Sequence, residues 1–373
     1  TPVINTARDS SVMDAIEAEL ENLRLAWQFA IMGQKYEALD NALDPVFYFY
    51  LGRGMLREGV EIFKSYTDAM MMCGRGVEKR YYRALARQLL LCSRLGQYET
   101  VLREGKKPYD YFKKHGNNVE LAVTLNGMMY SAMMRGEYAL AKQYGNEALE
   151  AVGDMAHVAT WFTAMGNFGY LLYLEGDLQE ARYTYEAILH TIESGSVDYS
   201  AIGTAYMRNN LGEVMRDAGA LEEAMRLFQA AYDVFKRDRH PRGVAFTANN
   251  LAGIHFVQYR MKEAMALYEE SYRINKEIGD RYGLGHSLCA LGNVAMMLGK
   301  YEEARAYFTQ SLELRRDLRD LRGMADSLAD LALVSLNLRE AEVALRYIDE
   351  AIVLRRQLND VGELAAALAN KAM

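Results

Sequence analysis

The chain has few helix breakers and few cysteines. Only 4 of its 373 residues are proline, which favours long helices because proline ends or kinks a helix. Cys73, Cys92 and Cys289 stand far apart and outside any CxxC spacing, which fits neither a disulfide framework nor a zinc site. Two of the three lie in apolar stretches, so we expect buried free thiols in a reducing compartment.

Signatures of membrane proteins and enzymes are also missing from the sequence. There is no apolar run of about 18 residues or more that would span a membrane, and the polar start does not resemble a signal peptide. The histidines form no HExxH, and neither a phosphate-binding G-x-x-x-x-G-K-[ST] nor a G-x-S-x-G occurs. We therefore expect a cytoplasmic protein with no membrane contact, no metal, no cofactor and no enzymatic activity.

Charge of one sign does not dominate any region. The net charge is −7, and basic pairs such as Lys106-Lys107 and Arg315-Arg316 are too short for a nucleic-acid surface, which needs a basic stripe. The chain starts without methionine, and it stops inside a helical pattern at Met373. We therefore expect a piece of a longer protein that does not bind nucleic acid directly.

What the sequence does contain is a long internal repeat. Small apolar residues recur every 40 residues, with one step of 43, at Val101, Ala141, Ala181, Ala224, Ala264, Ala304 and Ala344. A period of this length indicates stacked supersecondary units rather than one globular core. Stacked units bind partners along an extended face, so we expect a binding protein.

Other positions keep the same register. A large residue precedes a small one at Leu211-Gly212, Leu251-Ala252, Leu291-Gly292 and Leu331-Ala332, and aromatic residues follow the repeated alanine at Tyr185, Phe228, Tyr268 and Phe308. These spacings predict two antiparallel helices whose small residues make room for the aromatic ring. Glycines five residues before the alanine (Gly136, Gly176, Gly219, Gly299) predict the end of the first helix.

An aspartate also recurs between units, at Asp280, Asp320 and Asp360. An acidic residue every 40 positions could suggest metal ligation, but these residues fall on separate turns. We interpret them as N-caps, where a carboxylate accepts from the first amides of the next helix.

The pattern resembles the tetratricopeptide repeat, in which Leu-Gly is followed by Tyr, Ala, Phe and Ala. The resemblance implies an all-α fold, a right-handed superhelical α-solenoid of about eight helix hairpins plus flanking helices. A basic residue replaces the usual closing proline (for example Lys236), which lets the second helix run on and explains the longer period. We expect a flanking helix in 1–35, divergent hairpins in 36–115 and a regular array in 116–373 of one continuous solenoid.

The predicted helix ranges are 12–33, 36–51, 55–72, 77–95, 98–114, 117–135, 138–152, 156–175, 178–194, 199–218, 221–238, 241–258, 261–278, 281–298, 301–318, 321–338 and 341–358, with a last helix from about 361.

The N-terminal third suggests a particular context. The segments 21–27 (ENLRLAW) and 45–59 (PVFYFYLGRGMLREG) resemble the start of the repeat region in STAND proteins, the signal-transduction ATPases that include AfsR-like and MalT-like transcriptional regulators. The resemblance implies a sensor domain of a larger regulator whose nucleotide-binding module is absent here.

Candidate binding residues are those that tetratricopeptide arrays direct into the concave groove. They are Asn126, Tyr130, Tyr170, Tyr173, Tyr206, Asn209, Glu213, Arg216, Phe246, Asn249, Phe256, His286 and Asn293. The column Asn126, Asn209 and Asn249 could pair with an extended peptide backbone, and the aromatic residues could anchor it. The alternative is that these asparagines only satisfy hydrogen bonds between helices, as we expect for Asn210 and Asn250.

Two functions follow from this reading. The favoured one is a sensor that binds a protein, a peptide or a small effector in the groove and changes its curvature, which alters contacts with the missing nucleotide-binding module. The second is a constitutive scaffold that joins protein partners without sensing.

Overall fold

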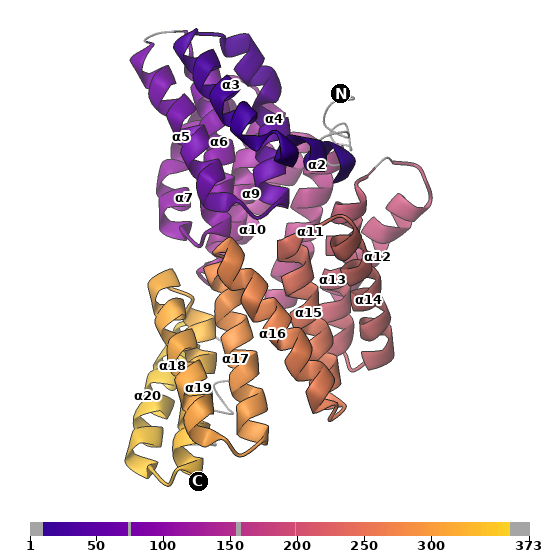
Figure 1. Cartoon of the computed structure of the whole chain (residues 1–373), viewed down its shortest axis with the longest axis vertical. Helices are drawn as coiled ribbons and strands as arrows, with labels where there is room; N and C mark the ends of the chain where they lie inside the picture. The colour runs from indigo at the N-terminus through magenta and orange to yellow at the C-terminus, as the bar shows by residue number, and fades with distance from the viewer. Residues whose placement is uncertain (1–9, 74–75, 154–157, 198, 359–373) are drawn as a thin grey trace. The chain divides into compact units, whose positions relative to one another are not determined.

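The computed structural model describes residues 10–73, 76–153, 158–197 and 199–358, and every regular element in these ranges is an α-helix. The predicted fold class, an all-α solenoid of repeated helix hairpins, is confirmed (Figure 1). The chain forms two compact units. Among the described residues, unit 1 holds 10–133 and 138–247, and unit 2 holds 134–137 and 248–358, apart from the gaps given above.

Unit 1 opens with two flanking helices and continues in hairpins. The flanking helices are α2 (Ser10–Ala18) and α3 (Leu20–Met32). The hairpins are α4 (Tyr36–Gly52) with α5 (Leu56–Met72), α6 (Glu78–Arg94) with α7 (Tyr98–Glu104) and α8 (Lys106–Lys114), α9 (Asn118–Met134) with α10 (Tyr138–Val152), α11 (Val158–Glu175) with α12 (Leu178–Glu193), and α13 (Ala201–Asp217) with α14 (Leu221–Arg237).

Unit 2 continues the same alternation of first and second helices. α15 (Pro241–Val257) begins in unit 1 and enters unit 2 at residue 248. It is followed by α16 (Met261–Ile278), α17 (Arg281–Met297), α18 (Tyr301–Leu318), α19 (Leu321–Asn337) and α20 (Ala341–Gln357). Most helix ends lie within two residues of the sequence-based ranges. The predicted helix from 361 and the cap Asp360 lie outside the described residues.

Two predicted helices are broken in the structure. The predicted helix 12–33 corresponds to two helices, α2 and α3, which are separated at Glu19. The range 98–114 divides into α7 and α8 at Gly105. Pro108 explains the second break, because proline has no N–H to donate to the carbonyl of Glu104 and its ring crowds that carbonyl.

The repeated small residues lie where the sequence pattern placed them. Val101, Ala141, Ala181, Ala224, Ala264, Ala304 and Ala344 are all 1% exposed or less. A Cβ on Gly292 of α17 would lie 2.5 Å from the ring of Phe308 in α18, and one on Gly212 would lie 2.6 Å from the ring of Phe228. The glycine therefore provides the space that the aromatic ring fills, as predicted.

Gly292→Ala is expected to destabilise the protein by about 1–3 kcal/mol, because the new methyl group displaces Phe308 in a packed interface. Gly253→Ala is the matched control, since a Cβ there meets nothing closer than 3.7 Å. Gly253 lies inside a helix, so alanine should stabilise it by about 0.5–1 kcal/mol. Urea unfolding checks both variants, and shifts of the same sign would contradict the packing argument.

The turns also follow the predicted chemistry. Gly136, Gly176, Gly219 and Gly299 all adopt positive φ, from 71° to 87°, after the first helix of a hairpin. Asp280 and Asp320 each accept from the backbone N–H three residues on, at 2.9 Å. Both aspartates are therefore N-caps, as the sequence suggested.

Candidate functional site

The first helices of successive hairpins contact one another directly in unit 1. Contacts join α4 with α6 and α11 with α13, and hydrogen bonds and ion pairs cross between these helices. We call the following side chains the first-helix face: Asp40, Asp44, Arg80, Arg83, Arg87, Arg94, Glu120, Tyr130, Tyr170, Tyr173, Glu213, Arg216 and Asp217. Five of them (Tyr130, Tyr170, Tyr173, Glu213 and Arg216) are among the residues predicted from the sequence.

Four predicted residues meet between α11 and α13. The rings of Tyr170 and Tyr173 stack with centroids 5.9 Å apart. The hydroxyl of Tyr173 donates to Asp217 at 2.7 Å and accepts from Arg216 at 3.3 Å. Burial and the charge of Glu213 raise the pKa of Tyr173 above its ordinary value, so its hydroxyl stays protonated at neutral pH.

Arg216 stays charged in this cluster. Burial lowers its pKa, but Glu213 and Asp217 more than offset that effect, and the pKa of Arg216 is raised. The cluster thus offers a fixed guanidinium and two tyrosine rings, with Arg216 about 29% exposed. Such a combination of arginine and tyrosine is common where binding energy concentrates in protein interfaces.

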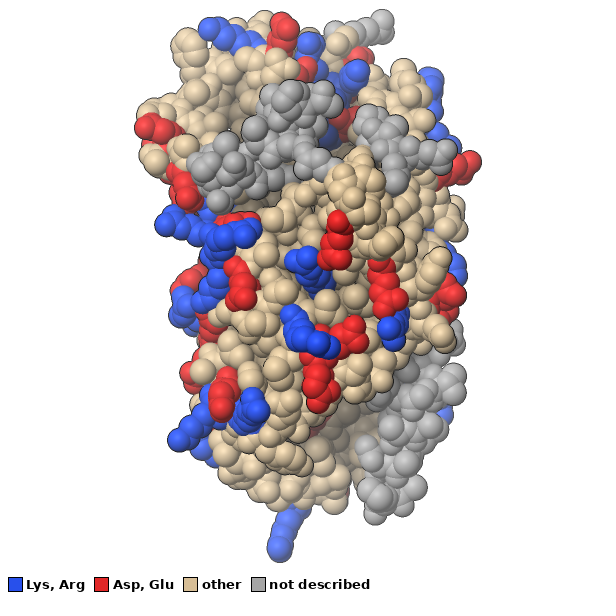
Figure 2. Space-filling model, turned by 90° about the vertical axis from the view of Figure 1, so that its right-hand side faces the viewer, with Lys and Arg blue, Asp and Glu red and all other residues tan. Residues whose placement is uncertain are grey.

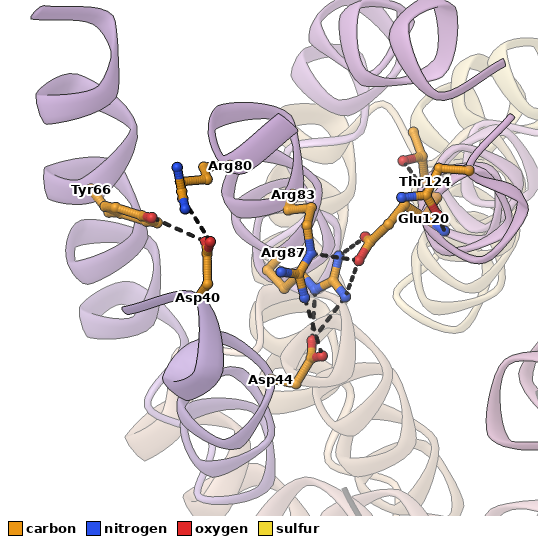
Figure 3. Close-up of polar contacts among 9 residues, drawn as sticks. Asp40, Asp44, Tyr66, Arg80, Arg83, Arg87, Glu120 and Thr124 are labelled. Atoms are coloured by element: carbon orange, nitrogen blue, oxygen red, sulfur yellow. Dashed lines mark hydrogen bonds and ion pairs between the residues drawn. The ribbon is translucent and has the colours of Figure 1, made fainter. Parts of the chain in front are cut away.

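A second part of the first-helix face is an ion-pair network between α4, α6 and α9, which Figure 3 shows. Arg87 donates through Nε to Asp44 at 2.9 Å and also pairs closely with Glu120. Arg83 donates to Glu120 at 2.8 Å, and Arg80 donates to Asp40 at 2.7 Å.

The network is most buried at its centre. Arg87 and Glu120 are 5% and 6% exposed. Burial raises the pKa of Glu120, but the guanidinium groups of Arg87 and Arg83 outweigh it and hold that pKa below its usual range. Glu120 is therefore ionised at neutral pH, so it is suited to holding helices together and not to donating a proton.

Sequence reasoning missed this network, although a signal was present. Asp40, Arg80 and Glu120 follow one another at the 40-residue step and alternate in charge. The register of the apolar residues weakens before residue 100, and that weakening hid the pattern. A search for opposite charges at the repeat spacing would have found the Asp40–Arg80 pair, whereas the other pairs of the network are separated by 33, 37 and 43 residues.

The predicted asparagine column is largely buried. Asn126 is 4% and Asn209 is 0% exposed, whereas Asn249, in unit 2, is half-buried. Oδ1 of Asn126 is buried without a hydrogen-bond partner. Asn210 donates to the hydroxyl of Tyr185 at 3.2 Å, which is the structural role expected for it. A binding role for the column stays a prediction.

The remaining predicted residues are dispersed. In unit 1, Tyr130 lies under the guanidinium of Arg94, 4.1 Å from the ring centroid, and Phe246 is half-buried. In unit 2, Phe256 packs on an apolar cluster that includes Tyr268. The ring centroids of His286 and Tyr282 are 4.7 Å apart, and Asn293 is exposed.

Tyr206 contacts a buried histidine in the turn between α14 and α15. Its ring lies 5.6 Å from His240, which is 7% exposed. Nδ1 of His240 accepts from the backbone N–H of Gly243 at 3.1 Å. Burial, helped by the charges of Arg242 and Arg53, lowers the pKa of His240 to about 4.

This lowered pKa predicts acid sensitivity. The unfolded chain binds a proton at His240 near pH 6.5 and the folded chain only near pH 4, so stability is lost as pH falls between these values. From pH 7 to pH 5, His240 should cost about 2 kcal/mol of unfolding free energy. His240→Asn, which keeps an acceptor for Gly243, should lack that part of the pH dependence. Urea unfolding at both pH values checks it, and an equal pH dependence in the two proteins would contradict it.

The surface is chemically mixed. Figure 2 shows acidic and basic side chains interspersed on one face of the molecule. None of the described helices is both long and apolar enough to cross a membrane. The described residues also contain no group of three or more His, Cys, Asp or Glu side chains arranged to hold a metal ion.

Two segments of the chain match known protein-family models, and both matches agree with the helical-repeat fold. Residues 243–317 and 204–237 match family models described as tetratricopeptide repeat. Tetratricopeptide repeats occupy these two segments. No curated protein sequence matches the chain significantly.

Two solved structures of low sequence identity share the tetratricopeptide-like fold. One is a Rap protein complexed with competence and sporulation factor, at 16% identity and a TM-score of 0.60, covering 94% of this chain and 93% of that one. The other is the Cut9–Hcn1 hetero-tetramer of the APC/C, at 16% identity and a TM-score of 0.61, covering 94% of this chain. This chain spans 60% of the length of that chain. At this identity the similarity establishes the fold.

Proposed function

We propose that the chain is a non-catalytic domain that binds a protein or peptide partner on the first-helix face of unit 1. The observation that carries the proposal is the cluster of Tyr170, Tyr173 and Arg216. It combines two stacked rings and a partly exposed guanidinium whose position is fixed by hydrogen bonds. A preorganised group of this kind loses little side-chain entropy on binding.

The match to a Rap protein complexed with competence and sporulation factor, which covers 94% of this chain, supports the same class of function. The resemblance of residues 21–27 and 45–59 to STAND proteins supports a place in a larger regulator. In that setting, a partner bound in the concave groove would shift the curvature of the repeats and alter contacts with a nucleotide-binding module. The buried asparagines Asn126 and Asn209 could then take part only after such a shift.

Selection from a phage-displayed library of random peptides about 12 residues long tests the proposal. Peptides enriched on the wild-type chain are synthesised, and their affinities are measured by calorimetry. Tyr170→Ala and Arg216→Ala should each weaken binding about tenfold or more, a loss of about 1.4 kcal/mol or more.

Tyr183→Ala is the matched control for this experiment. Tyr183 is a tyrosine on α12, a second helix, and it is 70% exposed. Its replacement should leave peptide affinity unchanged. Failure to enrich any peptide, or equal losses from Tyr170→Ala and Tyr183→Ala, would overturn the proposal.

A constitutive scaffold is the second candidate. It is favoured by the ion-pair network, in which three carboxylates already neutralise three guanidinium groups and tie α4, α6 and α9 together. Small-angle scattering with an enriched peptide separates the two functions. A scaffold keeps its dimensions on binding, whereas a sensor changes them.

A further inference from the structure

Arg53 joins two parts of unit 1 that are far apart in the sequence. It directly follows α4, the first helix of the first hairpin. Its Nη1 donates to the backbone carbonyl of Arg239 at 3.1 Å, across 186 residues of sequence. Arg239 lies in the turn that follows α14, the second helix of the fifth hairpin.

This contact requires the hairpins of unit 1 to curve. Neighbouring helices pack about 8–10 Å apart, so the first and fifth hairpins of a straight stack would be separated by about 40 Å. The hydrogen bond shows that these ends meet. The contacts of α4 with α6 and of α11 with α13 favour a place for the first helices on the inner side of this curve.

The Arg53 side chain is held on the side of α2. Its Nε pairs with Glu17 at 3.0 Å, and its Nη2 pairs closely with Asp14. Met13 packs against Gly52 at the end of α4, so α2 covers this position. The Arg53 side chain is only 5% exposed. Because the guanidinium is planar and carries several N–H donors, it can bond to α2 and to the distant turn at the same time.

The connection to the turn is weaker than the connection to α2. The contacts that reach the turn include the carbonyl bond from Arg53 and a 3.5 Å ion pair between Arg239 and Asp14, whereas α2 holds Arg53 through two carboxylates. Asp14 and Glu17 are 44% and 47% exposed, so water can solvate them when the contact opens. The contact can therefore break without leaving an unpaired buried charge.

We propose that Arg53 is a clasp that holds unit 1 as a closed arc, and that opening this clasp controls access to the first-helix face. The statement about access rests on the proposed binding function. The statement about closure rests on the geometry alone. Spin-label distances test closure, and peptide affinity tests access.

Spin labels at Ala18→Cys and Lys236→Cys, with Cys73→Ser to remove the exposed native thiol, report the separation of α2 and α14 by pulsed electron resonance. The wild-type background should give one short distance. Arg53→Met should broaden the distribution and add a longer population, because the methionine cannot bond to the carbonyl of Arg239. Arg57→Met, at an exposed arginine on α5, is the control and should keep the short distance.

A second variant guards against loss of fold. Asp14→Ala with Glu17→Ala removes the carboxylates that fix Arg53, together with the ion pair between Asp14 and Arg239, and should also lengthen the distance, while circular dichroism reports the helix content of each variant. An unchanged distance in the folded Arg53→Met variant, or in the double variant if Arg53→Met does not fold, would overturn the clasp.

Peptide affinity tests whether opening the clasp controls access to the first-helix face. An enriched peptide should bind Arg53→Met about threefold or more tightly than wild type, because less of the protein must open before binding. Equal affinity for Arg53→Met and Arg57→Met would overturn control of access. The distance measurement does not depend on a peptide, so closure is tested even if no peptide binds.

Discussion

Arg87→Met is expected to lower the free energy of unfolding by about 3 kcal/mol at pH 7.5. The reason is that Glu120, 6% exposed, loses its closest cation and stays buried as an anion. Arg83 still reaches Glu120 at 2.8 Å and recovers part of the loss. Asp44 is 23% exposed and can be hydrated, so it adds little. Urea unfolding followed by circular dichroism measures the change.

Two further measurements identify the cause of that loss. Arg87→Met combined with Glu120→Gln removes the charge as well as its partner, so this double variant should recover at least half of the loss. Protonation of Glu120 in acid should also shrink the difference between wild type and Arg87→Met at pH 4.5. A double variant as unstable as the single one would assign the loss to packing and contradict the electrostatic account.

Phe308→Ala is expected to cost about 3–5 kcal/mol, the largest effect in unit 2. The Phe308 side chain is 1% exposed and lies in the space left by Gly292 between α17 and α18. Its removal leaves a cavity that two rigid helices cannot close. Urea unfolding measures the loss, and hydrogen exchange should place the strongest loss of protection in α17 and α18.

A double-mutant cycle tests whether Gly292 and Phe308 act as a pair. The methyl group of Gly292→Ala conflicts with the ring of Phe308, so the smaller side chain of Phe308→Leu should relieve that conflict. The double variant Gly292→Ala with Phe308→Leu should therefore lose about 1 kcal/mol less unfolding free energy than the sum of the two single losses. Strictly additive losses would mean that Gly292 is not needed to make room for the ring of Phe308.

Most of the fold could be predicted from the sequence because the residues that begin and end each helix act on their immediate neighbours and recur from repeat to repeat. Gly219 and Gly299 end first helices through positive φ, and Asp320 begins the next hairpin as a cap. Each signal acts over a few residues and recurs, so one correct unit predicts the others. The predicted helices were broken at Glu19 and at Gly105, and at the second break Pro108 is a local helix-breaking signal that the repeat-based prediction did not use.

The candidate site was less predictable, because burial and pairing depend on neighbouring helices. Periodicity placed Tyr173 and Arg216 on first helices, and the structure brings them together. The same periodicity selected Asn209, whose burial comes from packing that no spacing reveals. The Arg53–Arg239 contact is set by curvature accumulated over five hairpins, which the repeat step alone does not specify.

The most direct test of binding on the first-helix face is photo-crosslinking from two tyrosine positions. A benzophenone amino acid replaces either Tyr170 on α11 or Tyr183 on α12, and each protein is irradiated with a selected peptide. The account predicts adducts from position 170 and none from position 183. Adducts from position 183 alone would contradict it, because they would place the partner on the second helices.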